Sequence, residues 1–259
     1  MNSAHERQIS WIIRVHVALA LALACGCGTL AAQEIKPPLA AAEVVSRMVA
    51  MSDRRNEALR SYSSVRSYSI DVNGVKHLHA EMVVSMNYQW PNTKELTILS
   101  ESGSGTLRHR VLRALLEAEL EAMQPDNQRQ SALSPENYSF ELVGYTTTDA
   151  GDCYILEVRP RIKNKFLFKG RIWVEDKGFA ITRIVGQPAV NPSWWTAKSD
   201  FQRNYKKIGD FWLPESNESE TKVRVFGTAV LTIDYERYEI REAAGVNAAS
   251  TWEKPSSGQ

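Results

Sequence analysis

The sequence has little cysteine, little histidine and no excess of either charge. Its 259 residues include three cysteines, which are too few for a disulfide scaffold. Lysine and arginine number 31, and aspartate and glutamate number 30, so the net charge is +1. Nucleic-acid binding driven by a basic surface is therefore not expected. Hydrophobic residues make up 43% of the chain, which excludes disorder for most of it.

Long apolar runs are also absent, except near the N-terminus. There, Arg7 and Arg14 precede an apolar stretch at residues 15–24, and small residues follow it up to residue 33. This three-part layout is typical of a bacterial secretory signal, so we expect residues 1–33 to be a signal peptide that is removed. The alternative is a membrane anchor, because the uncharged stretch of residues 15–33 approaches the shortest spanning length.

The chemistry of this cleavage has two alternatives. An ordinary signal peptidase would cut near residues 31–33. In the second alternative, Cys25 or Cys27 ends a lipobox-like segment, becomes lipidated and anchors the protein to a membrane. Alanine rather than leucine stands three residues before either cysteine, so ordinary cleavage is the better match. We therefore expect an exported, periplasmic protein, with a membrane-anchored lipoprotein as the alternative.

Residue patterns typical of catalysis or metal binding are scarce in the sequence. His77 and His79 share a strand face without a third ligand at a recognisable spacing, so we expect an exposed pair rather than a metal site. Residues 102–105 (SGSG) do not satisfy the G-x-S-x-G pattern of a hydrolase. Phosphate-binding and dinucleotide-binding glycine motifs are absent, and Cys153 is expected to be a buried, inert thiol. We therefore predict a protein that is not an enzyme and has no cofactor and no metal.

The spacing of apolar residues predicts one domain at residues 34–242. Residues 39–61 and 106–123 have the pattern of amphipathic helices, with Glu119 on the solvent side of the second. Elsewhere, apolar and polar residues alternate in about ten strands joined by short turns such as residues 73–74, and a meander of this length must curl or close. The predicted fold is mainly β (α+β), a strongly curved antiparallel sheet or half-open β-barrel with two amphipathic helices covering its concave face. Residues 243–259 are predicted to be a loose tail.

The apolar face of these strands forms either a packed core or a ligand cavity. A curved sheet of about ten strands encloses more volume than two helices easily fill, which favours a hydrophobic cavity. Its predicted lining residues are Leu156, Val158, Ile172, Val174, Ile181, Leu231 and Ile233. The loop that contains Trp194 and Trp195 is predicted to form the rim. Alternation alone does not tell which face of the sheet is concave.

Three segments of the chain resemble a known superfamily. Residues 154–160 (YILEVRP) resemble the Y-x-L-x-V-x-P strand of LolA/LolB-like proteins. Residues 170–184 contain GRIWVE and FAITRI, which are similar to the hairpin that follows in that superfamily. Residues 205–214 (YKKIGDFWLP) resemble a strand pair of lipoprotein-sorting-like sequences. The resemblance extends over residues 39–241. The same superfamily includes the N-terminal domain of the RseB/MucB regulators.

The resemblance implies a half-open barrel whose hydrophobic cavity holds acyl chains under a helical lid. The function it implies is that of a non-enzymatic periplasmic protein that binds lipid or acylated lipoprotein and sorts lipoproteins to the outer membrane. Its partners would be this cargo and membrane donor and acceptor proteins, and we expect a monomer. One alternative is an envelope-stress sensor of the RseB type that signals through a protein partner. An envelope hydrolase is the least favoured alternative.

Overall fold

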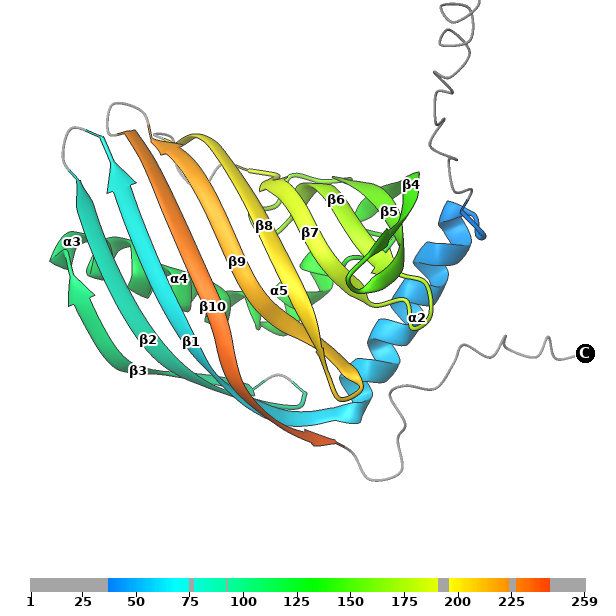
Figure 1. The fold of residues 1–259 in the computed structure, drawn as a ribbon, viewed down its shortest axis with the longest axis horizontal. Helices are drawn as coiled ribbons and strands as arrows, with labels where there is room; N and C mark the ends of the chain where they lie inside the picture. The colour runs from blue at the N-terminus through cyan, green and yellow to red at the C-terminus, as the bar shows by residue number, and fades with distance from the viewer. Residues whose placement is uncertain (1–36, 75–76, 92, 191–195, 224–226, 243–259) are drawn as a thin grey trace, which may run out of the picture. The chain divides into compact units, whose positions relative to one another are not determined.

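The computed structural model describes residues 37–74, 77–91, 93–190, 196–223 and 227–242 (Figure 1). Several sequence-based predictions concern residues outside these ranges. They are the signal peptide with Cys25 and Cys27, the rim residues Trp194 and Trp195, and the tail at residues 243–259.

Ten antiparallel strands form one sheet, as the alternation of apolar and polar residues predicts. Their spatial order is β3-β2-β1-β10-β9-β8-β7-β6-β5-β4. No pairing joins β3 to β4 in the described part of the chain, so the curved sheet is open. The strands are β1 (Leu59–Asn73), β2 (Leu78–Gln89), β3 (Thr93–Gly103), β4 (Tyr138–Thr148), β5 (Gly151–Pro160), β6 (Phe168–Glu175), β7 (Ile181–Pro188), β8 (Thr196–Ile208), β9 (Phe211–Val223) and β10 (Gly227–Glu242).

The helices come from two separate parts of the chain. Helix α2 (Ala41–Ala58) precedes β1. Between β3 and β4 come α3 (Gly105–Leu107), a π-helical turn (Arg108–Leu112), α4 (Arg113–Ala122) and α5 (Pro125–Ser131). Both predicted helices are confirmed with slightly different ends. The third, α5, was not predicted, because it has no buried side chain and therefore no apolar stripe. It begins at Pro125, a residue preorganised for the first helical position.

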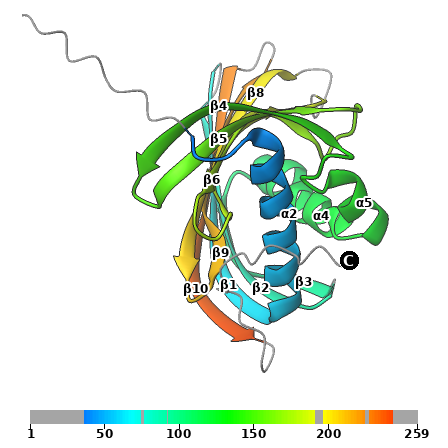
Figure 2. The same ribbon diagram turned by 90° about the vertical axis from the view of Figure 1, so that its right-hand side faces the viewer.

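The topology explains why helices cover one face of the sheet. Strands β3 and β4 are the two edges, so the chain between them must cross the whole sheet. This crossing contains α3, α4 and α5, which run behind the sheet in Figure 1. Helix α2 lies on the same side (Figure 2). The helix-covered, concave face is therefore built from the first helix and from the crossing segment.

Two large apolar cores lie beneath these helices. Under α2, Val44, Val45, Met48 and Met51 at helical spacing contact side chains from β4 to β7. Under α4, Leu112 and Leu116 contact β1, β2 and β10. A smaller cluster around Phe211 joins the end of α2 to β9. The two helical segments thus stabilise opposite halves of the sheet.

Strand β9 contains a proline, Pro214, close to its start. The ladder between β8 and β9 shifts register between Asn204 and Tyr205, and Pro214 pairs with Tyr205 just after the shift. A bulge of this kind accommodates a proline, which has no backbone N–H to donate. The strand therefore continues through Pro214.

Gly170 permits an unusually close approach of β6 and β7. Its φ is +156°, and a Cβ added there would lie 2.1 Å from the carbonyl oxygen of Val185. Gly151 also has a positive φ, +100°, but a Cβ there would meet nothing within 4 Å. Alanine substitutions at the two glycines therefore distinguish the free-energy cost of a strained backbone, present at both positions, from that of a steric clash, present only at Gly170.

We expect Gly170→Ala to destabilise the protein by roughly 2 kcal/mol more than Gly151→Ala, because only the first variant adds overpacking to backbone strain. Urea unfolding of both variants at equal protein concentration measures the difference. Equal losses of unfolding free energy in the two variants would show that β6 and β7 can move apart at little cost.

Candidate functional site

A cavity of about 710 Å³ lies on the concave side, where α2, α5 and the middle of the sheet meet. This volume is in the range of small-ligand sites. Its lining comes from α2, the ends of β1, β2 and β3, the segment around α5, and β7 to β9. The cavity thus lies between the two helical covers rather than under either one.

Most lining side chains are apolar or aromatic. The larger ones are Met48, Val49, Leu59, Tyr62, Tyr88, Trp90, Met123, Leu133, Phe179, Ile181, Tyr205, Phe211, Trp212 and Leu213. Charged lining residues are few: Asp53 and Arg55 from α2, and Lys94 from β3. Arg55 donates hydrogen bonds to the carbonyl oxygens of Gly178 and Phe179, at 2.7 and 3.3 Å. Burial, together with nearby Glu57, raises the pKa of Asp53.

The predicted lining residues all lie on the helix-covered face, and they fall into two groups. Leu156, Val158, Ile172 and Val174 are 0% exposed in the core under α2, and Ile181 packs against this core. Leu231 and Ile233 belong to the other core, under α4. Ile181 lines the cavity, whereas the other six are core side chains with the helices in this position. Their role as ligand contacts stays a prediction.

Sequence reasoning missed the aromatic residues of the cavity. Tyr62 contacts Tyr88 with ring centroids 5.3 Å apart and Tyr238 at 6.0 Å. The hydroxyl of Tyr88 donates to the carbonyl oxygen of Pro91 at 3.0 Å. These residues stand at strand ends, and only their pairing in the sheet brings them together.

A charged cluster adjoins the cavity at Lys94. Arg66 donates to both carboxylate oxygens of Glu119 at 2.7 Å, and the Lys94 ammonium donates to one of them, Oε1, at 2.8 Å. The three side chains come from β1, α4 and β3. Arg66 is only 4% exposed, Lys94 12% and Glu119 27%. The expectation that Glu119 faces solvent is therefore wrong, because the curved sheet brings two cations beneath that side of the helix.

The cluster keeps Glu119 ionised. Burial acts to raise the pKa of this carboxyl, but Arg66 and Lys94 outweigh burial and hold the pKa below its ordinary value. The cavity-lining Tyr62 lies in the field of the same groups, and burial is the main reason that its pKa is raised to about 12. Lys94 and Tyr62 thus connect the cavity to this charged cluster.

A third cation, Arg203, lies on the same face of the sheet. It is opposite Asn217 in the β8–β9 ladder, and Asn217 is opposite the core residue Ile233, so the three side chains share one face. No carboxylate forms an ion pair with Arg203 in the described part of the chain. Burial acts to lower the pKa of this guanidinium, but Tyr205, Tyr235 and the charge of Glu119 act against burial and raise the pKa.

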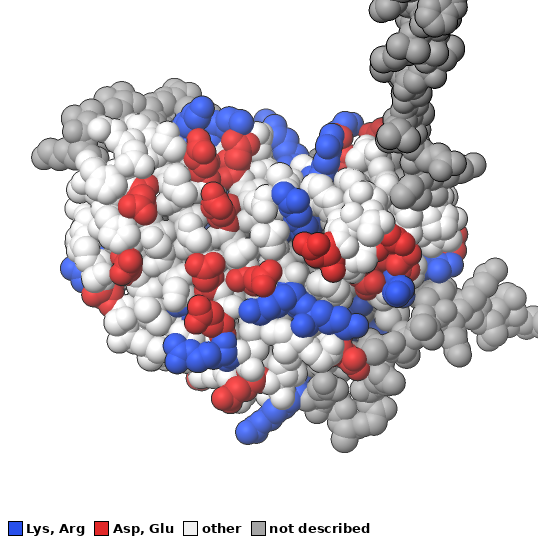
Figure 3. Space-filling view, viewed as in Figure 1, with Lys and Arg blue, Asp and Glu red and all other residues white. Residues whose placement is uncertain are grey.

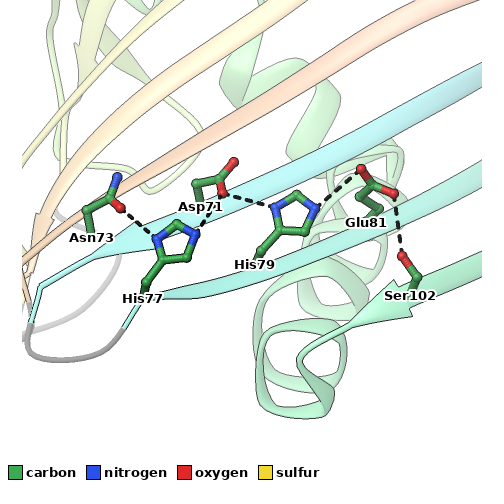
Figure 4. A network of polar contacts seen from close by, with 6 residues as sticks. All are labelled: Asp71, Asn73, His77, His79, Glu81 and Ser102. Carbon is green, nitrogen blue, oxygen red and sulfur yellow. Dashed lines mark hydrogen bonds and ion pairs between the residues drawn. The ribbon is translucent and has the colours of Figure 1, made fainter.

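The uncovered face of the sheet is different in character. Lysine and arginine lie beside aspartate and glutamate across it, with no large area of one sign in this view (Figure 3). Near the β1–β2 hairpin, His79 lies between two carboxylates, with Nδ1 3.0 Å from Asp71 and Nε2 3.3 Å from Glu81 (Figure 4). His77 contacts Asn73 at 2.8 Å.

The histidine cluster is a surface network rather than a recognisable site. His77 and His79 remain well exposed, at 65% and 39%. Among the described residues, no group of three or more His, Cys, Asp or Glu side chains is arranged to hold a metal ion. The concave cavity is therefore the better candidate for function. No helix in the described ranges is long and apolar enough to cross a membrane.

Glu119→Gln is expected to destabilise the protein by about 2 kcal/mol, because it leaves Arg66 buried without a counter-charge. Glu121→Gln on the same helix is the matched control, since Glu121 pairs with exposed Lys165 and should cost less than about 0.5 kcal/mol. Because the pKa of Glu119 is lowered, its contribution is present above the ordinary value of 4.5 and is lost as pH falls through the folded value. Urea unfolding across this range measures both effects; similar curves for the two variants would contradict the role of the ion cluster.

The hydrogen bond to Asp71, followed by the contact with Glu81, raises the pKa of His79 above its ordinary 6.5. His79 therefore stabilises the hairpin below that ordinary value, and this contribution is lost as pH rises through the folded pKa. NMR titration of the imidazole should show the raised value, and Asp71→Asn should lower it. Ser102→Ala is the control, because Ser102 contacts only Glu81 within this network. An unchanged His79 titration in Asp71→Asn would refute this assignment.

A search of curated proteins found no match. Solved structures with a similar fold include a DUF1329 family protein from Desulfovibrio piger, 15% identical, TM-score 0.41, covering 81% of this chain and 95% of that chain. A LolA superfamily protein from Nitrosomonas europaea is 12% identical, TM-score 0.36, covering 79% of this chain and 95% of that one. An outer membrane lipoprotein-sorting protein domain from Vibrio parahaemolyticus is 10% identical, TM-score 0.41, with 80% and 94% covered.

At the level of sequence, residues 48–236 match a family described as a family of unknown function, DUF5686, and this segment is well over half of the chain. The chain belongs to the DUF5686 family.

Proposed function

We propose that this protein is a non-enzymatic, exported binding protein that holds the acyl chain of a lipid or acylated lipoprotein on the concave side of its sheet. The observation that carries the proposal is the cavity of about 710 Å³ between α2, α5 and the sheet, in which apolar and aromatic side chains outnumber polar and charged ones. Export rests on the signal-like pattern of residues 1–33.

The chemistry of the cavity favours binding over catalysis. Its charged lining residues are Asp53, Arg55 and Lys94, and Arg55 and Lys94 are engaged in hydrogen bonds to the protein itself. Apolar burial alone supplies enough free energy for a carrier, at roughly 0.8 kcal/mol per methylene group. A chain of ten buried methylenes would therefore contribute about 8 kcal/mol before the cost of association.

The arrangement of α2 gives such a site a way to enlarge. Its contacts with the sheet are made mainly by Val44, Val45, Met48 and Met51. If α2 moves outward, Leu156, Val158, Ile172 and Val174 become exposed directly beneath it and extend the apolar lining beyond Ile181. These four residues, Ile181 and the observed cavity would then form one continuous surface. Sorting of lipoproteins to the outer membrane, with donor and acceptor proteins, is the cellular role that we propose for this site.

Native mass spectrometry of the full chain, produced in a bacterium and purified without detergent, tests the proposal. We expect a bound mass that extracts into organic solvent as phospholipid or acylated material. Ala132→Trp should weaken this binding about tenfold or more, since Ala132 lines the cavity and a ring there would occupy the acyl site.

The matched control is Ala118→Trp, at an exposed position of α4 that does not line the cavity. It should retain the bound mass. A protein that stays free of ligand after incubation with phospholipids and lipopeptides would refute the proposal, and so would equal binding by the two tryptophan variants.

A further inference from the structure

The floor of the concave face has more positive than negative charge. Arg66, Lys94 and Arg203 are three cations, and Glu119 is the carboxylate bonded to two of them. Lys206, also on β8, reaches the carbonyl oxygen of Tyr235 at 3.3 Å and adds a fourth cation beside this group. Placing charges out of water is costly unless opposite charge compensates them. The arrangement therefore has an electrostatic deficit that an anion would relieve.

Several donors on this floor also lack acceptors. The Nε atoms of Arg66 and Arg203 and the hydroxyl of Ser64 are buried and have no hydrogen-bond partner among the described residues. Ser64 and Arg66 lie on the same face of β1, two residues apart, and Arg66 is opposite Tyr235 of β10. The Arg66 guanidinium lies 5.0 Å from the centre of the Tyr235 ring. Buried donors in folded proteins are nearly always satisfied, and a bound anion or an ordered water would supply the acceptor here.

This floor is connected to the cavity. Lys94 lines the cavity and bonds to Glu119, so one side chain belongs to both. Tyr62 and Tyr205 also line the cavity. Tyr205 is a direct neighbour of Arg203, and Tyr62 lies within the field of Arg66 and Glu119. Met48, Val49 and Phe179 line the cavity on its α2 side, together with Asp53 and Arg55.

We infer that the ligand of this cavity is an amphiphile with an anionic head group, a carboxylate or a phosphate, which binds at the Lys94 end near Arg203 while its acyl chain lies toward α2. This inference rests on the proposed function and specifies the class of ligand. Guanidinium and ammonium groups form their strongest hydrogen bonds with carboxylate and phosphate oxygens. A neutral amphiphile would leave the positive charge of the floor uncompensated.

Binding of oleate and of methyl oleate to the full chain tests the inference, because the two share one acyl chain and differ in charge. Trp90 and Trp212 line the cavity and provide a fluorescence signal. We expect oleate to bind at least about tenfold more tightly than its methyl ester. Oleoyl lysophosphatidate as a third ligand distinguishes the two sources of negative charge, since the tighter of the two anions identifies the preferred head group.

Arg203→Gln and Lys94→Gln should each remove most of the preference for the anion, measured as the ratio of the affinities for oleate and methyl oleate. Lys165→Gln, a surface cation paired with Glu121, is the matched control and should keep the preference. Methyl oleate binding reports folding of each variant. If Arg203→Gln fails to fold, the Lys94→Gln variant and the wild-type affinities for oleate and methyl oleate still test the head-group inference.

Equal affinity of the wild type for oleate and methyl oleate would overturn the head-group inference and leave the proposed function intact. Failure of all three ligands to bind would instead contradict the proposed function. A preference for anions that survives in both Arg203→Gln and Lys94→Gln would show that the head group binds elsewhere.

Discussion

An open antiparallel sheet with one apolar face must cover that face, and the other features of this fold follow from how it does so. The ten strands do not close into a barrel, so burial between β3 and β4 cannot come from strand pairing. The chain uses the connection between these two edges as the cover and adds α2 from the N-terminal side. Each helical segment buries its own half of the sheet in a separate core. Covering by two independent segments leaves a junction between them, and the cavity is at this junction.

The junction has a polar side because α4 is attached to the sheet by charge as well as by apolar contacts. Leu112, the last residue of the π-helical turn, and Leu116 of α4 make the core contacts. Glu119, one turn after Leu116, accepts hydrogen bonds from Arg66 and Lys94. Such a buried ion cluster contributes little net stability compared with an apolar core, because desolvation offsets attraction. It does fix which turn of the helix lies over which strand. The same cluster places cations next to an otherwise apolar cavity, which is the basis for selecting an anionic amphiphile.

Local patterns in the sequence were sufficient for the strands and the two longer helices. Tyr68, Ile70 and Val72 alternate with polar residues because one face of β1 is covered, and the apolar positions of α2 recur at helical spacing for the same reason. Helix α5 was missed because its seven residues have no buried side chain and therefore no apolar period. The pairing of β1 with β10 joins segments at opposite ends of the domain, which no short-range pattern records. Glu119 was misplaced because its partners are distant in sequence, and helical periodicity cannot reveal a cation on another strand.

In the candidate site, too, local patterns predicted some features, and long-range contacts determined the others. Alternation identified the residues of the covered face correctly, yet four of the seven predicted lining residues are completely buried by α2. Whether a residue on the concave face is buried in a core or lines the cavity depends on where the helices end. The positions of the helix ends are set by long-range topology. The cavity is lined instead by strand ends and by the segment around α5, where Tyr62, Tyr88 and Trp212 meet from three parts of the chain. A binding site formed between two covers can change its volume when one cover shifts, while the sheet itself stays intact. Because the two cores are separate, a shift of α2 would leave the contacts of α4 in place, and the proposed holding and release of an acyl chain would need this independence.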